Sequence, residues 1–490
     1  MGGVSKPVRG GARSFNTFSY GPESISEVSL LIHSADWLVT VDEQRRIIRD
    51  GAIAINGDRI VAVGKTTDLS TRFRAKKEID ASGRLVLPGL IDTHVHNSQQ
   101  LGRGLADGCD IPIHLLQRLY GYEAQLMEED AYWAAMNCHL EMIRAGTTCF
   151  LDPGNYFPKQ MAQAVSESGL RGVIARIAFD VHATALGDLA HKVRRESTDE
   201  ALAHAQDAID KYHNTQDGRL RTWVGLRIPA VCSDELIQKA KAMADANGVG
   251  LVLHASEARD EVVASRVKFG MPDVERLAKL NALGKNVLLI HMGWASPKEL
   301  ALTLRHDACV SCTPSTGFRA GMGSMEFGRF PELLELGATV ALGSDSAMSS
   351  NYIDIVRQMS LAAGAAKSQR LDPTIMPPET VLEMATLHGS RALLWDDEIG
   401  SIVVGKKADI TFFDTIRPDW QPVLNPLANL VHSSRGGADT VICNGKVLME
   451  RGVVLSIDEK RTLHEAAVRG QRIAAQSGLL DAIKPLWPVS

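Results

Sequence analysis

Residues 88–96 read Pro-Gly-Leu-Ile-Asp-Thr-His-Val-His, a strand-like run that ends in His94 and His96. Side chains at positions i and i+2 of a β-strand point to the same face, so both imidazoles can reach one metal ion. The pair alone is weak support, because a chain of 490 residues with 15 histidines can produce one by chance. The alternative is a half-buried strand pair that bonds only to backbone groups. Other residues of the chain are needed to distinguish the two interpretations.

The centre of the chain alternates short apolar runs with helical stretches, which is typical of a parallel sheet built from βα units. Residues 234–247, for example, carry apolar side chains at helical spacing behind a Ser233 cap. We count eight candidate strands: Leu85–His96, Thr147–Asp152, Gly172–Phe179, Thr222–Ile228, Gly250–Ala255, Asn286–His291, Ala308–Cys312 and Ala338–Asp345. Eight strands close a (β/α)8 barrel, so we predict a TIM barrel over residues 87–394.

The two ends of the chain share a different sequence pattern. Residues 25–86 and 395–455 hold short β-branched runs, with the turns Asn56-Gly57 and Asn444-Gly445 between them. This pattern predicts a small composite β-sandwich domain formed by the N- and C-terminal segments, beside the barrel, in an α/β fold. We expect residues 1–24 to be a flexible tail without a secretory apolar segment, and residues 456–490 to be a helical extension.

Composition narrows the classes of partner. The net charge is -5 and no basic stripe occurs, which argues against nucleic-acid or anionic-membrane partners. No apolar run approaches the length of a membrane span. The seven cysteines are scattered without a CxxC pair, which favours a reducing cytoplasm. We therefore expect a cytoplasmic protein that binds a small molecule.

Polar residues stand where the predicted barrel strands end, which is where barrel enzymes place their working residues. They are His94, His96, His254, His291 and Asp345. Three neutral imidazoles and a carboxylate suit one divalent ion per subunit, with Zn²⁺ ahead of Fe²⁺ and Co²⁺. We predict His94, His96, His254 and Asp345 as ligands, with His291 either a further ligand or a group that holds the metal's water.

Glu257 follows His254 by three residues, in the loop above the predicted metal. A metal ion lowers the pKa of its water toward about 7, so that a metal hydroxide can attack an unsaturated carbon. The reaction then needs an acid for the leaving nitrogen, and we predict Glu257 as this proton shuttle. Catalytic roles are thus assigned to Glu257, His291 and Asp345, with Asp345 as the base; the alternative for Glu257 is an ordinary surface ion pair. No lysine falls in the third or fourth predicted strand, which favours a mononuclear site.

Six further residues are candidate contacts of the substrate. Trp294 and Phe318 follow barrel strands and could stack on a flat ring, although loop aromatics often only pack. The others are polar, and for His114 and His182 a purely structural role is an equal alternative. The full set is Gln100, His114, His182, Arg227, Trp294 and Phe318.

The chain resembles the amidohydrolase superfamily, in the branch of cytosine deaminase, adenosylhomocysteine/methylthioadenosine deaminases and the triazine hydrolases. The similar motifs lie at residues 86–94, 142–148, 343–345, 386–392 and 400–409. The resemblance implies a mononuclear metal hydrolase that acts on carbon-nitrogen bonds, or on carbon-halogen bonds in the triazine branch. It also implies a homodimer or homotetramer.

Two departures from this pattern concern the substrate. Residues 311–317 read Ser-Cys-Thr-Pro-Ser-Thr-Gly, where members of the branch commonly have Ser-His-Cys-Pro-x-Ser-Asn. Residues 226–229 read Leu-Arg-Ile-Pro, where the deaminases often have Pro-His-Ala-Pro. Both changes argue against an ordinary adenosine-type deaminase.

The sequence therefore predicts an enzyme, a metal-dependent aminohydrolase of a small N-heterocycle such as a triazine, pterin or purine-like compound. The first alternative is an amide, urea, carbamate or thiocarbamate hydrolase with the same mononuclear site. A remote alternative is a non-catalytic barrel scaffold.

Overall fold

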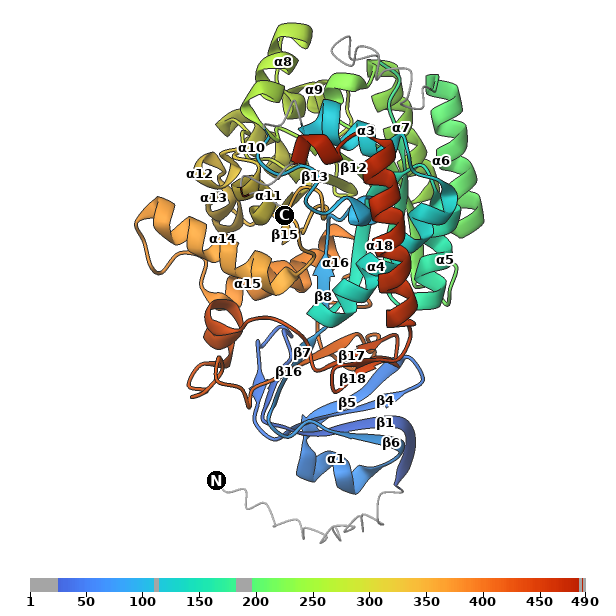
Figure 1. The fold of residues 1–490 in the computed structure, drawn as a ribbon. Coiled ribbons are helices and arrows are strands. Elements are labelled where there is room, and N and C mark those ends of the chain that lie inside the picture. Colours follow the sequence, from blue (N-terminus) through green and yellow to red (C-terminus); the bar gives the residue numbers. More distant parts are fainter. Residues whose placement is uncertain (1–24, 110–113, 182–195, 484–486, 488–490) are drawn as a thin grey trace, which may run out of the picture.

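The computed structural model describes residues 25–109, 114–181, 196–483 and 487 (Figure 1). The predicted tail at residues 1–24 lies outside the described residues. Two layers of β-sheet occupy one end of the molecule and the helix-covered barrel the other.

The centre of the chain forms the predicted barrel. Its sheet runs in chain order, and each neighbouring pair of strands is parallel. A parallel bridge between Val95 and Asp345 joins the first strand's extension to the last, and the Thr93 amide donates to the Leu342 carbonyl at 3.0 Å. The strands are β8 (Leu90–Asp92), β9 (Thr147–Asn155), β10 (Arg171–Ala178), β11 (Leu220–Leu226), β12 (Leu251–Ala255), β13 (Val287–His291), β14 (Cys309–Cys312) and β15 (Val340–Leu342).

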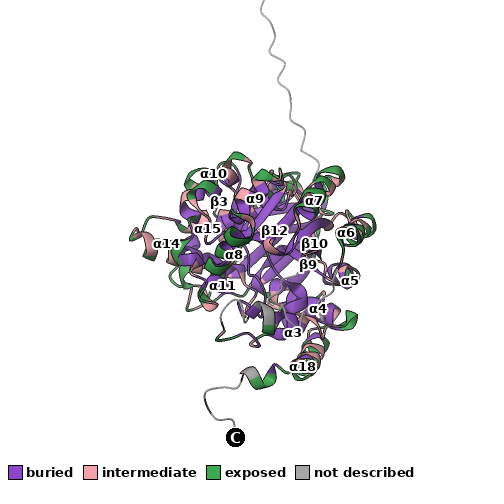
Figure 2. Cartoon of the chain, turned by 90° about the horizontal axis from the view of Figure 1, so that it is seen from above, coloured by how far each residue is buried: buried purple, intermediate pink, exposed green. Residues whose placement is uncertain are grey.

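Helices surround these strands, with exposed residues on their outer faces and buried strands inside (Figure 2). The predicted helix at residues 234–247 is confirmed, and the Ser233 hydroxyl caps it by accepting from the Leu236 amide. The longer barrel helices are α4 (Glu128–Ala145), α5 (Pro158–Ser168), α6 (Thr198–Tyr212), α7 (Asp234–Asn247), α8 (Arg259–Phe269), α9 (Asp273–Lys279), α10 (Pro297–Arg305), α13 (Phe330–Glu335), α14 (Ile355–Arg370), α15 (Pro378–Ala385) and α16 (Leu387–Ala392).

Short helical turns connect the strands at the mouth of the barrel. They are η1 (Asn97–Gly102), η2 (His114–Leu119), α3 (Tyr120–Glu123), η4 (Pro229–Val231), α11 (Pro314–Arg319) and α12 (Ser324–Phe327). Within the described part of the chain, every helix is too short or too polar to cross a lipid bilayer.

The β layers combine both ends of the chain. One sheet has the order β5-β4-β1-β6, and the other has the order β19-β18-β17-β16-β7-β2-β3. Ile32 of β1, Val86 of β7 and Phe412 of β16 share one apolar core between the sheets. The elements are β1 (Ser26–Ala35), β2 (Trp37–Val39), β3 (Ile47–Ile48), β4 (Gly51–Asn56), β5 (Arg59–Lys65), α1 (Thr66–Arg72), β6 (Phe73–Asp80), β7 (Arg84–Pro88), β16 (Ile410–Asp414), α17 (Pro426–Ala428), η5 (Asn429–Ser433), β17 (Thr440–Cys443), β18 (Lys446–Glu450) and β19 (Val453–Val454).

One predicted strand is wrong: residues 85–96 form two strands in two different sheets. β7 belongs to the composite sheet and β8 to the barrel, with Gly89 between them. A Cβ at Gly89 would lie 2.0 Å from the Thr148 hydroxyl, so only glycine allows this close crossing. The apolar pattern is the same on both sides of Gly89, and for that reason it does not reveal the change of sheet.

The last helices are α18 (Glu459–Gln476) and the turn η6 (Leu480–Ile483), within the predicted helical extension. α18 lies along α4, as Figure 1 shows, and its Arg469 and Arg472 pair with the fully buried carboxylate of Asp130. Because a buried charge must be compensated, this contact fixes α18 to the barrel.

A second buried ion pair joins the barrel to the composite sheet. Arg171, at the start of β10, donates to both carboxylate oxygens of Asp409 at 2.8 and 3.1 Å and to the Asn444 side chain at 3.0 Å. The Arg171 and Asp409 side chains are 0% and 2% exposed. The ion pair is therefore excluded from water, and each of the two charges needs the other to compensate for its burial.

We expect Asp409→Ala to lower the free energy of unfolding by about 3–5 kcal/mol, because it leaves the Arg171 guanidinium buried and unpaired. Denaturant unfolding monitored by tryptophan fluorescence measures the change. Asp414→Ala is the control, since Asp414 pairs with Arg84 at a partly exposed position and should cost about 1 kcal/mol or less. Equal losses in the two variants would contradict the assigned importance of the buried pair.

Candidate metal centre

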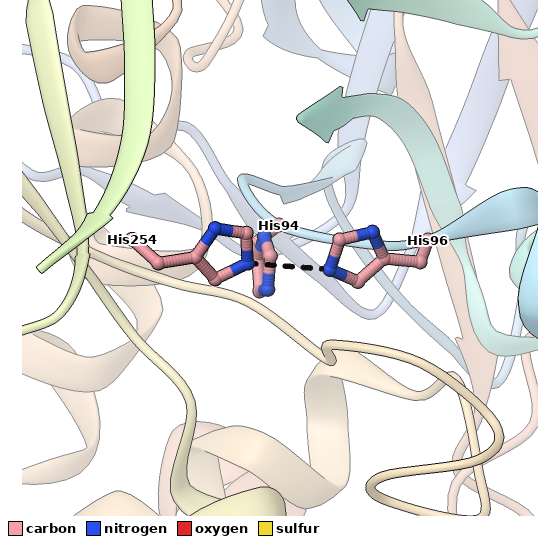
Figure 3. A group of neighbouring side chains, drawn as sticks. All are labelled: His94, His96 and His254. Atoms are coloured by element: carbon pink, nitrogen blue, oxygen red, sulfur yellow. Dashed lines mark hydrogen bonds between the residues drawn. The ribbon is translucent and has the colours of Figure 1, made fainter. Parts of the chain in front are cut away.

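The predicted ligands meet at the mouth of the barrel. His94 and His96 follow β8, His254 and His291 lie at the ends of β12 and β13, and Asp345 follows β15. Nitrogen or oxygen atoms of His94, His96 and His254 lie within 4.8 Å of one another, as do those of His94, His291 and Asp345. Figure 3 shows the three imidazoles of the first group turned toward a common point. The shared residue His94 makes the two groups one cluster.

Hydrogen bonds to the neighbouring backbone orient the residues of the cluster. The Asp92 carboxylate accepts from the backbone amides of His94 and Ser344, at 3.2 and 2.9 Å, and so joins the first and last barrel strands. His291 and Asp345 have left-handed backbones, with φ values of 73° and 63°. Such conformations are costly for residues other than glycine and are concentrated at functional sites.

Burial favours the neutral form of the imidazoles of His94, His96 and His254, and each neutral ring has one lone pair. Burial lowers the pKa of His94, and it lowers the pKa values of His96 and His254 well below their usual range. His254 Nδ1 lies 2.8 Å from the Arg227 carbonyl, which can only accept, so Nδ1 carries the proton and Nε2 faces the cluster. That Nε2 lies 3.3 Å from His96 Nε2.

Asp345 is the anion of the cluster. Burial acts to raise its pKa, but the close contact with His94 and the positive charge that His94, His291 and His96 carry when protonated hold the pKa well below the usual range. Asp345 Oδ1 lies 3.4 Å from His94 Nε2 and 3.8 Å from His96 Nε2. The Asp345 carboxylate therefore lies close to the Nε2 atoms of both His94 and His96.

These residues fit a divalent cation. Both ring nitrogens of His94 are buried without a hydrogen-bond partner. A neutral imidazole has one N–H and one lone pair, and leaving the lone pair without a partner is costly in a protein interior, so a metal ion would bind that nitrogen. Neutral imidazole nitrogens with one carboxylate are also the donor set that zinc and similar ions bind.

Glu257 lies beside this cluster and is not the surface residue of the alternative interpretation. Its side chain is 10% exposed, and its Oε1 is 3.5 Å from His291 Nε2. The other ring nitrogen of His291 is 2.7 Å from the Thr313 hydroxyl. Burial raises the pKa of Glu257, which favours the protonated form. A buried carboxyl group thus lies beside the candidate metal cluster.

A pocket opens over the cluster. Arg227 lies in its wall, where it pairs with Glu123 at 3.3 Å and stands 4.5 Å from the Tyr120 ring. The residues that line the pocket are His96, Gln99, His114, Leu119, Tyr120, Ile177, Arg227, Ile228, His254, Glu257, His291, Asp345 and Ser349. Of the predicted substrate contacts, His114 and Arg227 are thus in the lining.

Three predicted contacts are not among the residues that line this pocket. Gln100 donates to Glu141 at 2.6 Å, because the helical turn η1 directs consecutive side chains differently. Trp294 donates to the Met322 carbonyl at 2.7 Å, so its indole is engaged in packing, and Phe318 is 52% exposed. His182 lies outside the described residues.

Other lining residues were missed by the sequence prediction. Gln99 follows His96 by three residues. Its position just after the predicted ligand pair could have indicated a pocket residue. Tyr120 and its neighbour Glu123 come from a segment with no strand or motif pattern, so no local signal marked them.

Comparisons with known proteins agree with this geometry. Residues 85–448 match the amidohydrolase family. The chain is 34% identical over 425 residues to a 5-methylthioadenosine/S-adenosylhomocysteine deaminase of Moorella thermoacetica, covering 86% of this chain and 95% of that protein. It is 35% identical over 420 residues to a 5'-deoxyadenosine deaminase of Methanothermobacter thermautotrophicus, covering 86% and 94%.

Solved structures show the same architecture. An adenosine deaminase from Xanthomonas campestris with bound zinc aligns with a TM-score of 0.85 at 26% identity, covering 92% of this chain and 100% of that one. An atrazine chlorohydrolase from Arthrobacter aurescens TC1 complexed with zinc aligns with a TM-score of 0.81 at 25% identity, covering 90% and 100%. With a family match over most of its length and relatives above 30% identity, this chain belongs to the amidohydrolase family and is a hydrolase that acts on carbon-nitrogen bonds.

Proposed function

We propose that this protein is a metal-dependent aminohydrolase that removes an amino group from a purine-like N-heterocycle. The observation that carries the proposal is the convergence of four buried imidazoles, the Asp345 carboxylate and the Glu257 carboxyl group at one pocket. The relatives named as deaminases of adenosine derivatives support the choice of a purine-like ring.

His94, His96, His254 and Asp345 would hold one divalent ion per subunit, with Zn²⁺ as our first choice. When bound, the ion supplies Lewis-acid activation of a water molecule at neutral pH. His291 would hold that water or act as a further ligand, because it belongs to the group of His94 and Asp345 and its Nε2 lies 3.5 Å from Glu257 Oε1. Thr313 fixes the orientation of this imidazole through Nδ1.

Two carboxyl groups divide the proton transfers. Asp345 faces the nitrogens of His94 and His96 and would accept the proton that the attacking water loses. Glu257 has a raised pKa and can donate a proton to a ring nitrogen, then to the departing amine. Two carboxyl groups whose environments separate their pKa values are suited to act as base and acid in one reaction.

The pocket wall would orient the ring. Arg227 lines the pocket, is paired with Glu123, and has further N–H donors that a substrate would engage. The apolar side chains of Leu119, Ile177 and Ile228 complete the wall and exclude water from the flat faces of a heterocycle. A cation at this position favours a substrate that carries an acceptor oxygen or nitrogen opposite the amino group.

The test is a release assay with purified, metal-loaded protein. Purines, pterins, triazines, phenylureas and thiocarbamates are supplied, while ammonia, alkylamines and carbon dioxide are measured and products are weighed by mass spectrometry. We expect ammonia and an intact ring from a purine-like compound. Carbon dioxide with two fragments would replace the proposal by a urea or carbamate hydrolase, and a protein without stoichiometric metal and without turnover would indicate a scaffold.

A further inference from the structure

The loop that carries Glu257 has an unusual backbone. It begins at Ser256, directly after β12, where φ is 49° in the left-handed region. This conformation is costly for a residue with a side chain and persists only where its surroundings hold it. The direction of the Glu257 side chain therefore depends on contacts made to the backbone of the loop.

Three acidic side chains from three different helices provide these contacts. Asp273 of α9 accepts from the Ser256 amide at 3.0 Å, and Glu299 of α10 accepts from the Ser256 hydroxyl at 3.1 Å. Glu261 of α8 accepts from the Glu257 amide at 2.8 Å. Of these three, Glu261 bonds to Glu257 itself.

Asp273 and Glu299 also serve other parts of the structure. Asp273, the first residue of α9, accepts from the hydroxyl of Ser265 in α8 and so joins the two helices. Glu299 forms the capping box of α10 with Ser296 and also accepts from the Val274 amide at 3.1 Å. Replacing either would disturb helix ends as well as the loop, so they are poor probes of the loop alone.

We propose that Glu261 is a positioning residue that holds the Glu257 carboxyl at the metal cluster by accepting the backbone N–H of Glu257. The inference rests on the proposed role of Glu257 as the proton donor. Proton transfer requires a heavy-atom separation close to a hydrogen-bond length, and a displacement of about 1 Å lowers a rate by about 100-fold. Glu261 acts on the reaction only through the position of Glu257.

The protonation and hydrogen bonding of Glu261 suggest two substitutions that separate its role as an acceptor from its charge. Its Oε1 atom is buried, and burial together with the charges of Asp273 and Glu257 raises the pKa of its carboxyl well above the usual range. Glutamine is the neutral isostere of a protonated glutamate and keeps an oxygen that can accept the Glu257 amide. Leucine has a similar size but offers no acceptor.

The first experiment compares steady-state kinetics of Glu261→Leu and Glu261→Gln in the metal-loaded enzyme, with metal content and thermal unfolding measured on the same samples. We expect Glu261→Leu to lower kcat about 10- to 100-fold with KM within threefold and metal content unchanged. Glu261→Gln should stay within threefold of the parent. Asp260→Asn is the matched control, because Asp260 is an exposed acid in the same first turn of α8 and should leave kcat unchanged.

The second experiment places Glu261→Leu in the Glu257→Gln background. If Glu261 works through Glu257, the second substitution should change the residual rate less than threefold. A loss in that background as large as in the parent would overturn the inference, as would a Glu261→Leu enzyme with kcat within threefold of the parent. Should Glu261→Leu fail to fold, Glu261→Asp decides the same question, since it withdraws the carboxylate by one methylene and should also lower kcat.

The two proposals fail in different ways. Full activity in Glu257→Gln alone would remove the proposed role of Glu257. Loss of activity in Glu257→Gln with an unaffected Glu261→Leu enzyme would remove only the positioning role of Glu261.

Discussion

Glu257→Gln should lower turnover about 10²- to 10⁴-fold while the protein keeps its metal ion. The amide has the shape of the carboxyl group but cannot release a proton to a leaving nitrogen. Because Glu257 contacts His291 and is not among the four predicted ligands, metal stoichiometry should remain that of the parent. Turnover measured beside elemental analysis of the same sample checks both parts.

Glu235→Gln is the matched control for this experiment. Glu235 is a largely exposed residue on α7 that pairs with Lys239, so the same chemical change there should leave turnover within the error of the assay. A Glu257→Gln enzyme with parental turnover would mean that another group delivers the proton. A variant that loses its metal would instead make Glu257 part of the coordination sphere.

His96→Asn should weaken metal binding at least about 100-fold and abolish turnover at ordinary metal concentrations. The substitution removes one of the imidazoles that converge on the cluster, and its shorter side chain does not reach the same point. The parent, freed of metal by a chelator, should regain activity as one equivalent of Zn²⁺ is added. Its thermal midpoint should rise with metal concentration, since a ligand bound only by the native state stabilises it.

His204→Asn provides the comparison, because His204 is an exposed histidine of α6 that belongs to neither group of candidate ligands. It should bind metal and respond to the chelator like the parent. Undiminished turnover of the chelated parent would exclude a metal-dependent reaction. Parental metal affinity in His96→Asn would exclude His96 as a ligand.

The sequence predicted the barrel and the residues that converge at its mouth because both obey simple local rules. His254 and His291 end short apolar runs, and ends of parallel strands gather at one face of a barrel. The ligands could therefore be brought together without knowledge of the loops. The same rule led to Asp345, which lies in this cluster although the last strand ends at Leu342 and a bridge to Val95 continues the pairing as far as Asp345.

The parts that escaped prediction depend on contacts between distant segments. Gln99 and Gln100 differ only in the direction that one helical turn gives them, and no pattern of apolar residues encodes this direction. Tyr120 enters the pocket because Arg227 packs over its ring. The break at Gly89 likewise reflects the approach of Thr148, which lies far along the chain.

The composite sheet has a consequence for how the chain is made. Arg84 of β7 and Asp414 of β16 are register partners although they are 330 positions apart. At about 5–20 residues per second, a ribosome needs tens of seconds to deliver the missing neighbour of β7. Until then β7 presents an open edge to the crowded surroundings of a nascent polypeptide, where unpaired edges invite aggregation. Chaperone demand during biosynthesis should thus be concentrated on the N-terminal strands rather than on the barrel.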